Sequence, residues 1–154
     1  MTIDLTPRWD KFAVYLPAMQ YHYASAVDNN KLLKGRDFPK EIKLTDLDFL
    51  NPKSKLWHYG YALYSAGQFT DARPKACAIS NRDRKHTTVL GDSGGFQIGK
   101  GIINFDWKHF WEKQGDAGYV GEADKTRMAI LNWLEFTADY SMILDLPTWA
   151  SNPI

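Results

Sequence analysis

Two short apolar runs in the second half of the chain each end on an aspartate, and they constrain the fold more than any other feature. Thr87–Gly91 (TTVLG) leads into Asp92, and Ser141–Leu144 (SMIL) leads into Asp145. Runs without a polar alternation are typical of strands that are buried on both faces of a parallel sheet. The two aspartates are 145 − 92 = 53 positions apart, about the length of one crossover that carries an insertion. We therefore expect an α/β fold with parallel strands.

The segment between these runs contains the most regular helical pattern of the sequence. Ala123–Tyr140 repeats apolar residues at spacings of three and four, and Asp124 is placed to cap the helix. Asn104–Gln114 also has a helical spacing of aromatic residues, with Gly115 as its stop. The apolar residues that we expect to face the core from these two segments are Met128, Leu131, Leu134, Ala138, Trp107 and Trp111.

The first half of the chain is predicted to add two strands and a buried helix. Lys11–Ala18 and Lys75–Ser80 have the composition of short strands, the first of them ending at a proline. Leu56–Ala66 (LWHYGYALYSA) is apolar on most sides, so we predict a buried helix there with His58 in the core. Tyr21–Lys34 is expected to be loop with some helix, and Asn51-Pro52 marks a turn.

Composition places the chain among ordinary globular proteins with one domain, residues 1–154. It is 44% hydrophobic and 24% charged, and its formal net charge of +1 does not indicate a nucleic-acid partner. The basic run Asn81–His86 (NRDRKH) is either a solvated loop or a contact to a polyanion. The single cysteine, Cys77, excludes a disulfide framework within the chain, and we expect it to be a small buried hydrophobe. The start has no secretory pattern and no run approaches a membrane span, so we expect a cytoplasmic protein without a membrane partner.

The string Gly-Asp-Ser-Gly-Gly also surrounds the nucleophilic serine of chymotrypsin-like proteases, which gives a remote alternative function. That chemistry needs a histidine base backed by an acid, and none of the four histidines stands in the Ala-Ala-His-Cys setting of those enzymes. Phe96 occupies the position where the protease string has proline. The expected helices also disagree with a fold of two β-barrels, so the protease interpretation is disfavoured.

A second resemblance covers more of the chain. Val89–Gln97 (VLGDSGGFQ) resembles the Leu-Thr-Asp-Ser-Gly-Gly-Phe-Gln segment of the tRNA-guanine transglycosylase family. Ser141–Thr148 (SMILDLPT) resembles the Met-Ala-Phe-Asp-Glu block of that family, which also closes a strand after a helix. The resemblance implies a (β/α)₈ barrel of the TIM type, of which these residues form the N-terminal portion. It also implies the exchange of a guanine in nucleic acid for a 7-deazaguanine through a covalent glycosyl–enzyme intermediate.

The resemblance assigns roles to both strand-end acids. Asp145 would accept hydrogen bonds from N1–H and the exocyclic amine of a guanine that has left the stack. Asp92 would lie at the base and ribose, where it assists recognition or catalytic proton transfer. The alternatives are that Asp92 only caps the turn after its strand and that Asp145 only caps a loop ahead of Pro147.

The loop residues between Asp92 and the next element complete the predicted substrate site. Gly94 and Gly95 would let the backbone approach the ligand and present N–H groups to it. Ser93 and Gln97 would add hydrogen bonds around the base, with Gln97 alternatively acting as a support. Phe96 belongs to the same substrate loop and is expected to pack it down more than to touch the base.

The resemblance also indicates what the partners are and what this chain lacks. The family's nucleophilic aspartate and its zinc site of three cysteines and a histidine lie on later strands, so no cofactor and no metal site is expected within residues 1–154. A second chain or a homo-oligomer would complete the barrel. The expected partners are a 7-deazaguanine base and a nucleic acid, with DNA favoured over tRNA because the family's Asn-Thr-Tyr-His-Leu opening is not visible.

Two other functions remain open. The chain could be a non-catalytic subunit that binds nucleic acid or a partner and leaves the nucleophile to another protein. It could also belong to an unrelated α/β barrel whose glycine-rich loop holds a phosphate.

Overall fold

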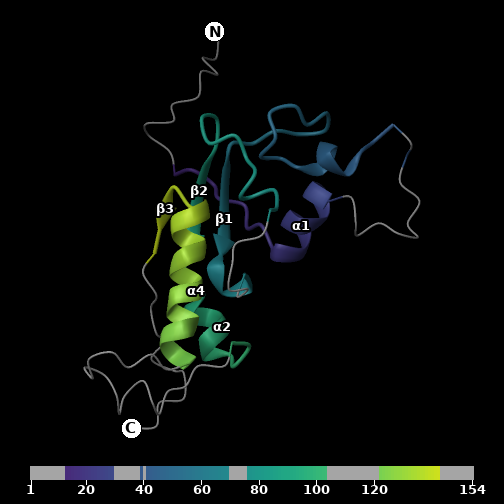
Figure 1. The fold of residues 1–154 in the computed structure, drawn as a ribbon. Helices are drawn as coiled ribbons and strands as arrows, with labels where there is room; N and C mark the ends of the chain where they lie inside the picture. Colours follow the sequence, from purple (N-terminus) through teal and green to yellow (C-terminus); the bar gives the residue numbers. More distant parts are fainter. Residues whose placement is uncertain (1–12, 30–38, 40, 70–75, 104–121, 143–154) are drawn as a thin grey trace.

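The computed structural model describes residues 13–29, 39, 41–69, 76–103 and 122–142 (Figure 1). None of the described helices is long and apolar enough to cross a membrane. The strands are β1 (Tyr61–Ser65), β2 (Thr88–Asp92) and β3 (Tyr140–Ser141). The helices are α1 (Tyr21–Asn29), α2 (Gly95–Gly99) and α4 (Glu122–Thr137), and the short 3₁₀ turns are η1 (Leu44–Leu47) and η2 (Ala66–Gln68).

The three strands form one parallel sheet in the order β1-β2-β3, which confirms the predicted α/β content and the parallel strands. Strand β2 begins one residue after the expected Thr87 and includes Asp92 as its last residue. Strand β3 begins at Tyr140, one residue before the expected run, of which residues 143 and 144 lie outside the described residues. The N-terminal run contributes a single parallel bridge, from Ala18 to Leu63, instead of the predicted strand.

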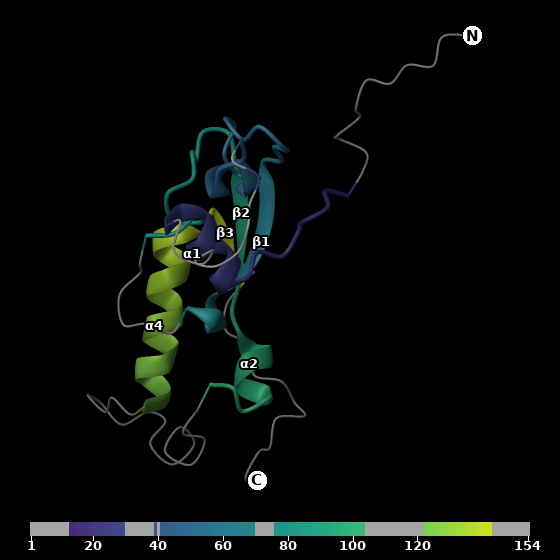
Figure 2. The same cartoon turned by 90° about the vertical axis from the view of Figure 1, so that its right-hand side faces the viewer.

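Helix α4 returns the chain from the end of β2 to the beginning of β3, and it lies against one face of the sheet (Figure 2). Helix α1 lies on the same side, and among the described residues no helix covers the opposite face. A doubly wound sheet has helices on both faces and reverses its strand order at one point. The sequential order and one-sided helices of this sheet differ from that arrangement, and its three strands do not close a barrel.

The core lies between α4 and the sheet face that carries Ala62, Tyr64 and Val89. The buried stripe of α4 consists of Ile130, Trp133, Leu134 and Thr137, at the spacing of one helix face. Gly91 leaves room for α4 where it meets β2, because a Cβ there would lie 2.5 Å from Cδ2 of Leu134 and 3.0 Å from Cβ of Ala138. These residues fix the helix on the sheet at the point where β2 leads into its C-terminal loop.

Two details of the predicted α4 are wrong. Met128 and Leu131 are 51% and 44% exposed, so the buried stripe is rotated away from the one that the spacing favoured. The sequence pattern contains two overlapping apolar faces. The face with Trp133 is the buried one, because the large Trp133 ring packs on the Phe69 ring, with their centroids 4.5 Å apart. The helix also begins at Glu122, so Asp124 lies within its first turn and not at its cap.

The first half of the chain departs most from the prediction. Leu56–Ala66 contains strand β1 where a buried helix was expected, and His58 is exposed. A short apolar run has no period that separates a helix from a strand, and pairing with β2 decides the outcome. Residues 76–80 form a turn instead of a strand, although Cys77 is buried as expected. The Asn51-Pro52 turn is confirmed by a bond from Ser54 N–H to the Asn51 carbonyl (2.9 Å).

The hydroxyl of Tyr64 joins the sheet to α4 from within the core. It donates to the Trp133 carbonyl (3.2 Å) and is hydrogen-bonded to the Thr137 hydroxyl. Burial raises the pKa of Tyr64 to about 12, because a phenolate cannot be solvated there. The neutral hydroxyl is therefore part of the folded structure.

We expect this hydroxyl to make the fold sensitive to alkaline pH. The folded-state pKa lies above the unfolded value of about 10, so its contribution is complete below about pH 10 and is lost as the pH rises towards 12. Tyr64→Phe should lack this loss, so the wild-type protein should lose roughly 2 to 3 kcal/mol relative to the variant across that window. Urea unfolding of both proteins over this pH range measures the difference. The exposed Tyr140→Phe variant serves as a control, and a parallel pH profile for Tyr64→Phe and wild type would contradict the prediction.

Candidate functional site

The carboxyl ends of β1 and β2 bring two polar side chains to the same edge of the sheet. Ser65 ends β1 and Asp92 ends β2, and the two residues are partners in the parallel register. Register partners lie on the same face of a sheet, here the face that α4 does not cover. Both side chains are half-buried, so they remain within reach of a ligand at this edge. The carboxyl ends of parallel strands are where α/β folds bind ligands.

The loop after Asp92 is held by a contact between two glycines. Gly94 has a left-handed backbone (φ 84°) and is the N-cap of α2, so the alternative in which Asp92 caps this helix is not realised. A Cβ on Gly94 would lie 2.5 Å from both N and Cα of Gly67, which follows β1 in η2. A Cβ on Gly67 would in turn lie 2.9 Å from Cα of Gly94. The two loops therefore touch backbone to backbone directly beside Asp92.

We expect Gly94→Ala to destabilise this edge by about 2 kcal/mol or more. The left-handed conformation costs an alanine about 1 to 2 kcal/mol, and the Cβ collision with backbone adds to it. Gly101→Ala is the matched control, because Gly101 also has a positive φ (68°) but has nothing within 4 Å of its Cβ position. The control should lose only the conformational part, about 1 kcal/mol. Equal losses in urea unfolding for the two variants would contradict the glycine contact.

Ser93 and Gln97 take up structural positions in the loop. Ser93 is fully buried, and its hydroxyl accepts a bond from the N–H of Gly95 (3.4 Å). The side-chain oxygen of Gln97 accepts a bond from the Ser65 hydroxyl (3.0 Å), which ties α2 to the end of β1. The Gln97 carbonyl also accepts N–H bonds from Ile102 (2.9 Å) and Ile103 (3.2 Å). Gln97 thus supports the geometry of the edge around Asp92.

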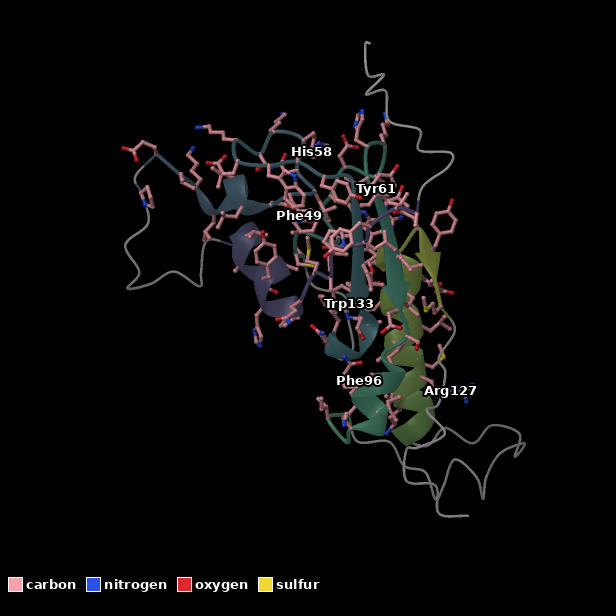
Figure 3. The ribbon with its side chains drawn as sticks, turned by 180° about the vertical axis from the view of Figure 1, so that it is seen from behind. Phe49, His58, Tyr61, Phe96, Arg127 and Trp133 are labelled. Carbon is pink, nitrogen blue, oxygen red and sulfur yellow. The ribbon has the colours of Figure 1, made fainter. Side chains whose placement is uncertain are left out.

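Phe96 does not pack the loop down, as the sequence suggested, because its ring is 56% exposed. The Lys100 ammonium lies 5.8 Å from the ring centroid, within the range of a cation–π contact. Figure 3 shows Phe96 at the same end of the molecule as Arg127, away from the aromatic side chains at the opposite end. An exposed aromatic ring and a cation therefore flank the glycine loop.

The opposite edge of the sheet contains the basic run that the sequence left between a solvated loop and a polyanion contact. The Arg82 side chain is fully buried and pairs with Asp139 (Nη2 to Oδ2, 2.7 Å). Arg84 donates to the carbonyls of Phe136 (3.1 Å) and Ala138 (3.4 Å), at the C-terminal end of α4. These two arginines join the loop that precedes β2 to the C-terminal end of α4, and they stabilise the fold. The amino-terminal edge of parallel strands is the stability face of barrel folds.

Sequence reasoning missed Ser65 and Gly67, the two residues that build the site from the side of β1. Ser65 was missed because Leu56–Ala66 was predicted to be a helix, and a helix places no residue in register with Asp92. Gly67 was missed because its contact with Gly94 exists only when β1 and β2 pair. Burial alternates along β1, but Tyr-Ala-Leu-Tyr-Ser does not alternate apolar and polar residues, so the sequence carried no local signal for a strand there.

Asp145, the second predicted acid, lies outside the described residues, as does the predicted helix Asn104–Gln114. The part of the chain that the structure describes contains no group of three or more His, Cys, Asp or Glu side chains that could hold a metal. Comparison of the chain with protein-family models, with curated proteins and with solved structures gives no match in any of the three. The function therefore has to be argued from the site itself.

Proposed function

We propose that this chain is a guanine-transglycosylase-like protein that exchanges guanine for a 7-deazaguanine in nucleic acid, with DNA favoured over tRNA. The observation that carries the proposal is Asp92 at the carboxyl end of a parallel strand, beside the Gly94–Gly67 contact that shapes the glycine loop. A carboxylate there is placed to contact a ligand at this edge. The resemblance of Val89–Gln97 to the family's substrate loop names the ligand as a guanine-type base.

The arrangement of strands supports a barrel wall as the setting for this site. The order β1-β2-β3 is sequential, and α1 and α4 lie on one side of the sheet. In a (β/α)₈ barrel the uncovered face points inwards, and residues at the carboxyl ends of its strands perform the chemistry. Ser65 and Asp92 lie on that face and at that end. The barrel itself is part of the proposal.

In this proposal some residues of the site contact the base, and others hold the loop in position. Asp92 faces the base and ribose, and Asp145 accepts the donors of the guanine edge. The buried loop around Gly94 and Gly95 holds the backbone close to the base. Gln97 positions the loop through Ser65, and Ser93 does so through Gly95. The exposed Phe96 ring is available to stack on a base or a neighbouring nucleotide.

The covalent step requires a nucleophile, which the proposal assigns to residues beyond these. Beyond the start of β1, the uncovered sheet face carries Leu63 of β1, Leu90 of β2, and Tyr140 and Met142 at β3. Tyr140 and Met142 are 68% and 50% exposed, so this apolar face is suited to burial against further strands. A second copy of the chain is the simplest way to bury this face, whereas the nucleophile itself comes from residues that neither copy contributes here. Light scattering in solution should then give a mass of a dimer or larger, and a lone 17.7 kDa species would contradict this part.

A base-exchange assay tests the function. The protein that carries the nucleophile in addition to these residues is incubated with DNA or tRNA and with isotopically labelled guanine or 7-deazaguanine, and label in the recovered polymer is measured. A higher incorporation of label into DNA than into tRNA supports the full proposal. Binding of the free base without incorporation favours the alternative, a non-catalytic subunit. If the free base is not bound and no polymer incorporates it, the proposal is overturned.

A further inference from the structure

A chain of aromatic rings runs through the first half of the molecule, with Phe49 buried in the core and the others at least partly exposed. Consecutive ring centroids lie 5.2–6.5 Å apart from Tyr23 through Phe49, Trp57 and Tyr59 to Tyr61. The rings of Trp57 and Tyr59 are nearly parallel, at an interplanar angle of 7°. We call the last three of these residues, Trp57, Tyr59 and Tyr61, the aromatic strip.

The aromatic strip is held rigidly from beneath but remains open to solvent. Tyr59 donates its N–H to the Phe49 carbonyl and its hydroxyl to the Tyr15 carbonyl, both at 2.8 Å. Trp57 is nevertheless 54% exposed and Tyr61 37% exposed. A buried helix was expected over these residues, but the rings are exposed. Packing in the core therefore does not explain why they are aromatic. Preorganised exposed rings offer stacking surface at little conformational cost.

The charge around the aromatic strip is positive. Lys53, Lys55 and His58 are exposed within the same segment, and residues 51–61 contain no acidic residue. The adjoining turn before β2, which packs on Gly60 through the His86 carbonyl, adds the exposed Arg84 and Lys85, and its one acid, Asp83, is paired with His86 (2.8 Å). Burial and the charge of the nearby Asp48 together raise the pKa of Tyr23, at the other end of the aromatic chain. The Trp57 end is therefore where aromatic rings and cations coincide.

We propose that the aromatic strip binds single-stranded nucleic acid, with bases stacked on Trp57 and Tyr61 and phosphates paired with Lys53 and Lys55. Proteins that hold single strands combine these two features, and stacking tolerates any base sequence. A proline-rich peptide also binds exposed aromatic rings, but a neutral peptide gains nothing from the two lysines. A duplex keeps its bases stacked inside and cannot use the rings.

This surface is separate from the glycine loop. His58 and Tyr61 lie at one end of the molecule, and Phe96 lies at the other (Figure 3). The inference goes beyond base exchange and holds whether or not the chain is catalytic. Binding of a strand here would retain the polymer while another nucleotide reaches Asp92.

The test is fluorescence anisotropy with a labelled oligothymidylate of about twenty nucleotides and the whole chain. Trp57→Ala should weaken binding about tenfold, the loss typical of one stacked base. Met128→Ala is the control, because Met128 is exposed to the same degree (51%) and lies on α4 next to Arg127, at the far end. Trp57→Phe should restore most of the affinity, which separates stacking from damage to the fold.

Salt dependence tests the charged half of the inference. Replacing both Lys53 and Lys55 by glutamine should reduce the slope of log affinity against log salt by about 1.4, or about 0.7 for each lost phosphate contact. Arg127→Gln, on α4, should leave the slope unchanged. The proposal is overturned if Trp57→Ala and Met128→Ala behave alike, if a duplex of the same length binds as well, or if only a proline-rich peptide depends on Trp57. The Asp92→Asn variant should still bind the oligonucleotide, because binding at the aromatic strip does not use Asp92. This separates a failure of the strand-binding proposal from a failure of the base-exchange proposal.

Discussion

Replacement of Asp92 by asparagine is expected to lower base exchange by about 100-fold or more. Asparagine has nearly the same shape, so the end of β2 and its register with Ser65 should persist. The substitution removes the negative charge and the proton acceptor that the proposed chemistry needs at the base and ribose. The loss of a general acid or base of this kind typically costs 10²- to 10⁴-fold in rate, which sets the estimate of about 100-fold as a lower bound.

The measurement is the initial rate of label incorporation at saturating base for wild type and variant. Asp83→Asn is the matched control, because Asp83 is an exposed acid on the opposite edge, where it pairs with His86 (2.8 Å). Urea midpoints for both variants establish that each is folded. If Asp92→Asn retains exchange within about threefold of wild type, Asp92 has no part in the chemistry and the site assignment is wrong.

Replacement of Arg82 by alanine is expected to destabilise the fold by about 3 kcal/mol without altering the carboxyl edge of the sheet. Arg82 is fully buried and donates to the Ile79 carbonyl and to Asp139 Oδ2, each at 2.7 Å. The same Asp139 oxygen accepts the Val89 N–H (2.8 Å), which fixes β2 against the start of β3. Removing one partner of a buried pair leaves the other charge uncompensated, and this costs about 3 to 5 kcal/mol. Asp139 is partly exposed, so we expect the lower end of that range.

Arg84→Ala provides the comparison on the same carboxylate. Arg84 is 47% exposed at its side chain and its Nε lies 3.9 Å from Asp139, a geometry that contributes about 1 kcal/mol or less. Urea unfolding followed by circular dichroism should therefore show a much larger shift for Arg82→Ala. A loss below about 1 kcal/mol for Arg82→Ala would mean that the buried pair does not hold this edge together.

Local pattern was sufficient for the parts of the fold in which neighbouring residues agree. The run before Asp92 is rich in β-branched and apolar residues and is followed by glycines, so strand β2 and its loop could be predicted. The long periodic segment before Tyr140 similarly predicted α4 to within a few residues. The parallel pairing of β2 and β3 could also be predicted, because the sequence has two continuous apolar runs with a helix between them.

The candidate site could be predicted only from the side of β2. Asp92, the glycine loop and Gln97 are contiguous, so the sequence placed them together. Ser65 comes from a segment that was predicted to be a helix, and Gly67 follows that segment directly. They join the site through register with Asp92 and the contact with Gly94. Such contacts link residues about thirty positions apart and leave no trace in local periodicity.

The sequence by itself determined which segments are apolar, where glycine permits a turn, and that an acid ends a buried strand. The tertiary structure alone decided that Tyr64 lies in a strand, that Trp133 and not Met128 faces the core, and that Arg82 is buried with Asp139. The reason is that each of these outcomes depends on a partner distant in the chain. A side chain's apolar area or charge is encoded locally, whereas the surface or opposite charge that satisfies it exists only after the chain has folded.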